Sequence, residues 1–132
     1  MATKMIFVSY DYDNDKHYKS MLLAWSRNTE FDFYMNDQST DVSIDSTDAG
    51  AIKRVISARI NGATYFLCLV GKSTHKSKWV AYEVAKAVEL KKRLVGVKIE
   101  KDNAPPAGLL NQGATWALSF TFEGIKKAID AA

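Results

Sequence analysis

The sequence predicts an α/β fold in which a parallel sheet is covered by helices on both faces. Two observations predict it. Short, mostly apolar segments alternate along the 132-residue chain with segments of helical periodicity. The apolar segments are nearly continuous in hydrophobic residues, which is typical of strands buried on both faces of a sheet. We therefore expect a three-layer sandwich with right-handed crossovers between parallel strands.

The first part of the chain predicts a strand, a helix and a second strand. Residues 4–10 (KMIFVSY) form a short apolar run bounded by polar residues, and residues 31–35 form another. Between them, Asp13 or Asn14 is the expected N-cap of an amphipathic helix. The apolar residues of that helix recur at the spacing i, i+3, i+4, i+7: Tyr18, Met21, Leu22 and Trp25.

Residues 36–48 are rich in Asp, Ser and Thr and predict a long loop, which is either a functional flap or a mobile connection. A second helix follows, with Ile52, Val55, Ile56 and Ile60 on one face. Asn61 and Gly62 are expected to end it, because glycine tolerates a positive φ.

The second half of the chain continues the alternation. Three further strands are expected, at residues 63–70, 94–99 and 115–120. The run at residues 63–70 is the most apolar in the chain and predicts the central strand. Ser77 is the expected N-cap of a helix that ends near residues 91–93, and Thr121 is the expected N-cap of a closing helix.

Five alternating strands favour the flavodoxin-like order 2-1-3-4-5. In that order a ligand binds at the carboxyl ends of the strands, where the winding reverses between strands one and three. The residues that leave those two strands are Ser9, Tyr10, Asp11 and residues 71–74, which end at Thr74. We expect them to lie at a binding site.

Composition limits the other possibilities. The length predicts a single domain over residues 1–132, and no apolar run is long enough to span a membrane. No signal peptide is apparent, so a cytoplasmic protein is expected. A net charge of +3 without a basic stripe does not favour nucleic-acid binding. His17 and His75 lack the spacing of a zinc site, and the single cysteine, Cys68, is expected to be a buried, inert thiol.

Trp79 and Glu83 are the strongest candidates for a functional site. They lie four residues apart at the start of the third predicted helix, which places an aromatic ring and a carboxylate on one helical face. Glu83 stands between Val80 and Val84, so it is expected near the interior, where an acid without a partner costs free energy. Trp79 has a plainer alternative as an aromatic residue at the edge of the core.

Two chemistries of this fold do not fit the strand ends. A phosphate-accepting receiver domain needs an Asp at the end of the third strand, where this chain has Val70 and Gly71. A nucleotide-phosphate loop after the first strand would be rich in Gly, Ser or Thr, whereas residues 10–15 read YDYDND. That acidic run would repel a phosphate group.

The chain resembles TIR-type domains. Residues 6–10 (IFVSY), followed by acidic residues, are similar to the first TIR box, and residues 79–83 (WVAYE) match the W-x-x-x-E pattern of members that cleave NAD. Within that superfamily, residues 69–83 resemble the TIR-like ThsB family of the Thoeris anti-phage system, and residues 94–99 (LVGVKI) resemble the strand that follows. The likeness spans most of the chain and is densest at residues 52–99.

The resemblance implies an enzyme that cleaves the nicotinamide–ribose bond of NAD and makes a cyclic ADP-ribose isomer, which activates a separate effector protein. Glu83 would be the catalytic carboxylate, and Ser9, Tyr10, Asp11, Thr74, Trp79 and Lys76 would bind the substrate. NAD would be a substrate, and no cofactor or metal is implied. The implied partners are further copies of the chain or other TIR-like subunits, with which it would assemble, and a phage-derived trigger.

Two departures from other TIR enzymes affect the expected substrate pose. Asp11 stands where those relatives often have a basic residue, and residues 36–48 lack the Gly/Pro-rich character of their second box. Two alternatives stay open. One is a non-catalytic TIR-like module for protein interactions, and the other is a nucleoside deoxyribosyltransferase, which also uses a carboxylate against a glycosidic bond.

Overall fold

A computed structural model describes residues 4–27, 33–35 and 49–132. Five parallel strands form one sheet in the order β2-β1-β3-β4-β5, which is the expected order. The strands are β1 (Lys4–Ser9), β2 (Phe33–Met35), β3 (Tyr65–Val70), β4 (Arg93–Lys98) and β5 (Thr115–Ala117). The helices are α1 (Tyr12–Ser26), α2 (Ala49–Gly62), α3 (Lys78–Glu89) and α4 (Phe122–Ala131), with short 3-10 turns η1 (Thr74–Lys76) and η2 (Ala107–Leu109).

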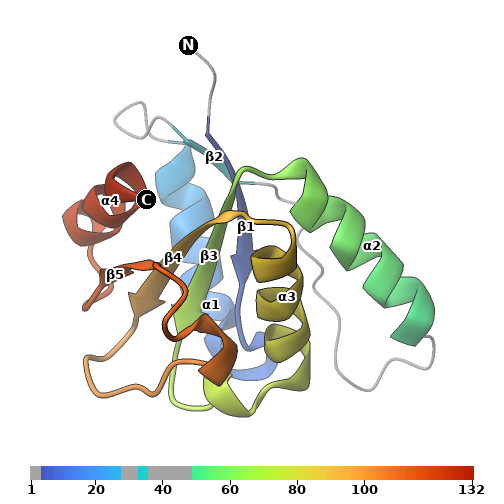
Figure 1. Ribbon diagram of the computed structural model, residues 1–132. Coiled ribbons are helices and arrows are strands. Elements are labelled where there is room, and N and C mark those ends of the chain that lie inside the picture. The colour runs from blue at the N-terminus through green and yellow to red at the C-terminus, as the bar shows by residue number, and fades with distance from the viewer. Residues whose placement is uncertain (1–3, 28–32, 36–48) are drawn as a thin grey trace.

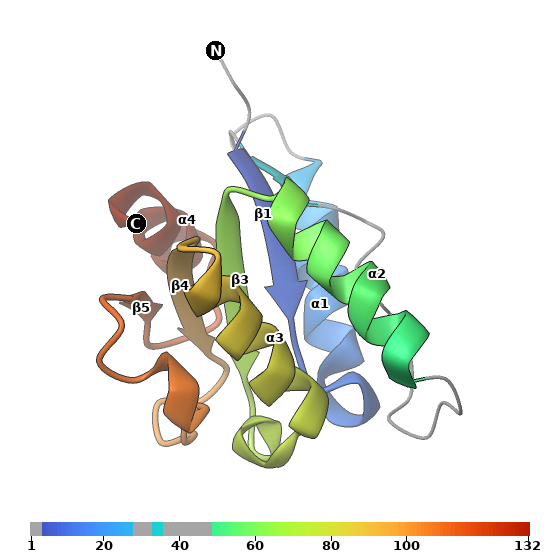
Figure 2. The same ribbon diagram turned by 45° about the vertical axis from the view of Figure 1, so that its right-hand side comes forward.

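The helices form the two outer layers of the sandwich (Figure 1). One apolar cluster joins the sheet to α1 and α4 through Leu22, Ile125 and Ile129. A second cluster joins the other face to α2 and α3, and Figure 2 shows these two helices side by side on that face. Every residue of β3 is buried, so the expected central strand is confirmed. The carboxyl end of β3 lies at the lower edge of the sheet in Figure 1.

Two of the expected caps are present as hydrogen bonds. The Ser77 hydroxyl accepts from the backbone N–H of Val80 at 3.2 Å at the start of α3, and the Thr121 hydroxyl accepts from that of Gly124 at 3.2 Å at the start of α4. Each satisfies one of the backbone donors that the first helical turn leaves free.

The expected cap of α1 was wrong. Asp13 and Asn14 lie inside the helix, because it begins at Tyr12 and Asp11 is the N-cap. The Asp11 carbonyl oxygen accepts from the backbone N–H groups of Asn14 and Asp15, at 3.2 and 2.8 Å. The helix therefore starts immediately after β1, which brings its first turn to the carboxyl edge of the sheet.

The ends of three other elements differ from the expectation in position or in backbone conformation. Gly62 ends α2 as expected but does not take a positive φ, which among described residues is found at Lys91, Asn111 and Gly113. The helix α3 ends at Glu89, and Lys91, at φ 57°, turns the chain so that the N–H of Lys92 donates to the Ala87 carbonyl at 3.0 Å. The strand β5 stops at Ala117, because the chain bends there and Phe120 packs on Trp25 of α1.

The predicted second strand and loop are described only in part. The strand β2 covers residues 33–35, and residues 31–32 lie outside the described residues. The polar segment 36–48, for which a flap or a mobile connection was expected, lies outside them entirely.

Candidate functional site

Glu83 and Ser9 meet at the carboxyl edge of the sheet, inside the layer formed by α2 and α3. The Ser77 cap sets the start of α3, and the helix then turns Val80, Glu83 and Val84 toward the sheet. Glu83 is only 7% exposed. Ser9, the last residue of β1, is fully buried, and its Oγ donates a hydrogen bond to Glu83 Oε1 at 2.8 Å. Within the described residues, the hydrogen-bond partner of this buried acid is thus supplied by a residue 74 positions away.

The surroundings of Glu83 change its acidity. Burial raises the pKa of this carboxyl to about 8, because the charged form loses its contact with water, and the Ser9 hydrogen bond opposes that rise. At neutral pH the carboxyl is therefore mostly protonated. A positive charge brought next to it would favour the ionised form.

Trp79 lies one turn before Glu83, between α3 and α2. Its ring centroid is 6.3 Å from that of Tyr82 in an edge-on arrangement, and the Lys53 ammonium of α2 lies 5.2 Å from the Tyr82 ring centroid. The Tyr82 hydroxyl lies 2.7 Å from Ser57 Oγ, which ties α3 to α2. The indole Nε1–H of Trp79 is buried and has no acceptor among the described residues, one helical turn from Glu83.

Tyr10 and Asp11 do not accompany Ser9. Tyr10 belongs to the apolar cluster under α1 and α4, so it points to the opposite face of the sheet from Ser9. Asp11 is buried at the start of α1, where its Oδ2 accepts from Asn14 Nδ2 at 2.6 Å. Their contact with a substrate stays a prediction.

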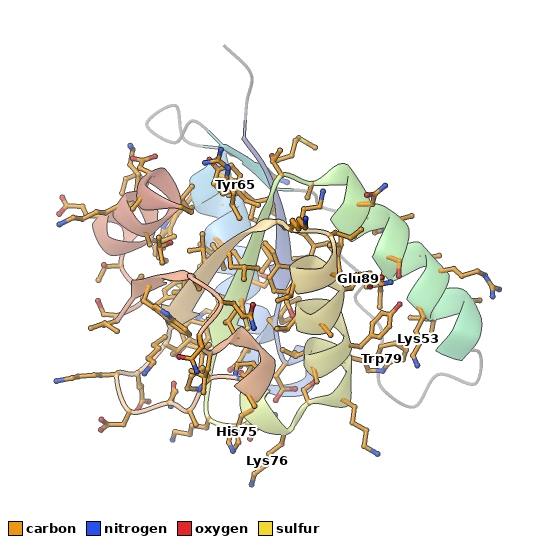
Figure 3. The ribbon with its side chains drawn as sticks, viewed as in Figure 1. Lys53, Tyr65, His75, Lys76, Trp79 and Glu89 are labelled. Atoms are coloured by element: carbon orange, nitrogen blue, oxygen red, sulfur yellow. The ribbon has the colours of Figure 1, made fainter. Side chains whose placement is uncertain are left out.

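Thr74 and Lys76 lie in the connection between β3 and α3. Thr74 is fully buried, and its Oγ1 accepts from the Gly71 N–H at 2.7 Å and lies 3.3 Å from Asp15 Oδ2. The hydroxyl therefore holds the turn after β3. Lys76 is exposed, and Figure 3 shows it pointing away from the body of the molecule. The structure brings neither side chain to Glu83.

Asp15 is a buried acid that the sequence reasoning missed. It is 6% exposed, and burial, followed by the nearby charge of Asp11, raises its pKa, while the Thr74 hydrogen bond opposes the rise. Its signal was present in the sequence, because Asp15 lies three and seven residues before Tyr18 and Leu22 and thus on the inward face of the helix.

Cys68 is buried as expected, beside both acids. It pairs with Ser9 across the β1–β3 ladder. Burial, followed by the charges of Glu83 and Asp15, raises the pKa of its thiol, so it stays a neutral S–H group. The two carboxyl groups therefore lie within electrostatic reach of one sulfur atom.

Metal ligands do not gather in the part of the chain that the structure describes. No three His, Cys, Asp or Glu side chains are grouped there as a metal site. Among the same residues, no helix is both long and apolar enough to cross a lipid bilayer.

Comparison with known proteins identifies a family. The model of the family described as "Thoeris protein ThsB, TIR-like domain" matches residues 7–104. A stretch of 49 residues is 33% identical to a Bacillus cereus (strain MSX-D12) protein named "Putative cyclic ADP-D-ribose synthase ThsB1". That stretch is 37% of this chain and 26% of the relative, so the chain matches about a quarter of the relative's length.

Solved structures share the fold at low sequence identity. The TIR domains of the activated Roq1 resistosome superpose with a TM-score of 0.53 at 15% identity, over 73% of this chain and 57% of that one. A 2-deoxyribosyltransferase from Bacillus psychrosaccharolyticus superposes with a TM-score of 0.61 at 12% identity, over 85% of this chain and 84% of that one. These likenesses show the fold alone.

Proposed function

The chain belongs to the TIR-like family of the Thoeris protein ThsB, and from that premise we propose that it is an NAD-consuming enzyme of anti-phage defence. It would cleave the nicotinamide–ribose bond and release a cyclic ADP-ribose isomer that a separate effector reads. The observation that carries the proposal is the buried Glu83 carboxyl, held by Ser9 at the carboxyl edge of the sheet. The product named for the Bacillus cereus relative supports the same chemistry.

The proposed reaction uses the change in ionisation of Glu83. The nicotinamide ring of NAD carries a positive charge, and its arrival would lower the pKa of the neighbouring carboxyl and favour the carboxylate. As the C1′–N bond breaks, its electron pair passes to the nicotinamide nitrogen and the positive charge moves to the ribosyl group. The Glu83 carboxylate would stabilise that oxocarbenium-like state.

Cyclisation requires an internal nucleophile in place of water. A nitrogen or oxygen of the same ADP-ribose would form the new bond to C1′ and lose its proton, so that no water is consumed. The Trp79 ring, one helical turn from the acid, is suited to exclude water, and its indole N–H, which has no acceptor among the described residues, is a donor for the substrate. Contacts from Tyr10, Asp11, Thr74 and Lys76 would require the segments around them to shift.

The same proposal includes partners. NAD is the substrate and no cofactor is needed. Activation would follow a phage-derived trigger and assembly with further TIR-like subunits, as the family implies.

The Glu83→Gln variant tests the proposal. It keeps the shape of the side chain and removes the charge, so we expect NAD turnover to fall by at least about 100-fold. The matched control is Glu89→Gln on the same helix, whose carboxylate is 66% exposed and pairs with Lys86 at 2.9 Å. Liquid chromatography with mass spectrometry should follow NAD and its products in lysates of phage-infected and uninfected cells. Full turnover by Glu83→Gln would refute the assignment.

The comparison with the deoxyribosyltransferase fold favours one other candidate. A buried carboxylate at a glycosidic bond would also serve transfer between deoxynucleosides. Incubation with NAD or with a pair of deoxynucleosides separates the two reactions, because only NAD contains a pyrophosphate. If Glu83→Gln changes neither reaction nor defence, the chain acts instead as a non-catalytic interaction module.

A further inference from the structure

A cavity lies at the carboxyl edge of the sheet, on the side of α1. Its volume is about 350 Å³, within the range of about 300–1,000 Å³ that small-molecule sites occupy. The first turns of α1 and the segments that leave β3 and β4 form its walls. Ser9, Trp79 and Glu83 do not line it.

Asp15 gives this cavity a buried acceptor. The carboxyl lies directly against Gly71, where a Cβ atom would come within 2.3 Å of Asp15 Oδ2. The absence of a side chain at Gly71 is therefore what makes room for the acid. Among the described residues its hydrogen-bond donor is Thr74 Oγ1, which lies 3.3 Å from Asp15 Oδ2 and also 3.3 Å from the Leu69 carbonyl oxygen, so its one hydrogen is shared between two acceptors. The carboxyl keeps acceptor capacity on a wall of the cavity.

The other lining residues limit the ligand. Glu100 and Asp15 supply two acids against the single cation of Lys72, so a phosphate or carboxylate ligand is disfavoured. Asn103 is buried, and its Oδ1 accepts from the Glu100 N–H at 2.9 Å, which leaves its Nδ2 as a donor. Tyr18 is half-buried and offers an aromatic ring on the same wall as Asp15.

A carboxyl acceptor, an amide donor and an aromatic ring in one polar cavity suit an uncharged molecule that carries hydroxyl groups and a flat ring. We propose that this cavity is an accessory nucleoside site, in which Asp15 accepts hydrogen bonds from the vicinal hydroxyls of a ribose and Tyr18 contacts the base. The site is separate from Glu83 and does not depend on the proposed reaction.

Adenosine and 2′,3′-dideoxyadenosine are the probes that test the site, because they differ only in the two hydroxyls. The full chain is titrated with each probe, and binding is followed by two-dimensional NMR and by calorimetry. Adenosine should bind and should change the chemical shifts of the backbone amides of Gly71 and Ser73. Binding should weaken about tenfold or more for the dideoxy compound and for Asp15→Asn. Glu83→Gln should bind adenosine as the wild type does.

Each contrary result overturns the proposal. Absence of adenosine binding at millimolar concentration would overturn it. Equal affinity for adenosine and 2′,3′-dideoxyadenosine would also overturn it. That comparison uses the wild type alone, so it decides the question even if Asp15→Asn fails to fold. Loss of binding in Glu83→Gln, or shifts centred on Ser9, would place adenosine in the other site. A failure of NAD turnover alone would leave these results unchanged, so the two proposals are tested independently.

Discussion

The Ser9 hydroxyl has one role in the structure that its position in the sequence did not suggest. Ser9 is fully buried and donates to the Glu83 carboxyl at 2.8 Å, so it acts on the acid, and its contact with a substrate stays a prediction. Because a hydrogen bond to the charged form favours ionisation, Ser9 makes Glu83 more acidic than burial alone would leave it.

Ser9→Ala is expected to raise the pKa of Glu83 above its present value of about 8. The rise of kcat/KM for NAD with pH, which reports the free enzyme, should then move to higher pH, and activity at pH 7 should fall about tenfold. Ser20→Ala is the control, because its hydroxyl donates to the Lys16 carbonyl on the exposed side of α1. An unchanged pH profile in Ser9→Ala would show that the hydrogen bond does not tune the acid.

At the scale of elements, the short edge strand β5 is held by a contact between Trp116 and Gly96. The two residues pair across the β4–β5 ladder, and a Cβ atom on Gly96 would lie 2.3 Å from the Trp116 ring. The indole therefore covers the glycine, and the Lys98 ammonium lies 5.8 Å from the ring centroid. A strand of three residues depends on such packing more than on its few ladder hydrogen bonds.

Gly96→Ala is expected to lower the free energy of unfolding by about 1–3 kcal/mol, because the added methyl group displaces the ring. Gly62→Ala is the matched control. It has no atom within 4 Å of the new Cβ and no positive φ, so alanine fits there without a clash or backbone strain. Urea denaturation of both variants measures the difference. Equal midpoints for Gly96→Ala and the wild type would contradict the packing argument.

At the scale of the whole molecule, the two buried acids make stability depend on pH in an unusual direction. The pKa values of Glu83 and Asp15 are both raised by burial. Each group therefore holds its proton more tightly in the folded than in the unfolded state. Its contribution to the free energy of unfolding is fully present below the pKa of the group in the unfolded chain. That contribution is lost as the pH rises through the pKa of the group in the folded protein.

For Glu83 this window runs from its ordinary pKa of 4.5 to about 8. The wild type should be less stable at pH 8.5 than at pH 5, and Glu83→Gln should remove most of that difference because it cannot ionise. Thermal unfolding at the two pH values measures the effect, and Glu89→Gln, whose carboxylate is exposed, should keep the wild-type dependence. A wild type and a Glu83→Gln variant with parallel pH profiles would show that Glu83 is not the source.

The arrangement of the strands could be predicted from the sequence, because alternation and continuous apolar runs restrict the topology strongly. The partner of Glu83 could not, since it depends on how β1 and α3 meet in space. Grouping Ser9 with Tyr10 overlooked the period of a strand, in which successive side chains point to opposite faces. Asp15 was missed because the acidic run was taken as a whole, although helical spacing places this one residue inward.

The buried thiol of Cys68, which responds to the charges of both acids, gives the protein a spectroscopic reporter of its own. Cys68 is the single cysteine of the chain, is fully buried, and feels the charges of both Glu83 and Asp15. Its S–H stretching vibration falls where protein absorbs little, so its frequency can follow the ionisation of the acids without any label. Infrared difference spectra recorded on adding NAD or adenosine would then follow the ionisation of the two acids through the S–H stretch of one residue at the centre of the sheet.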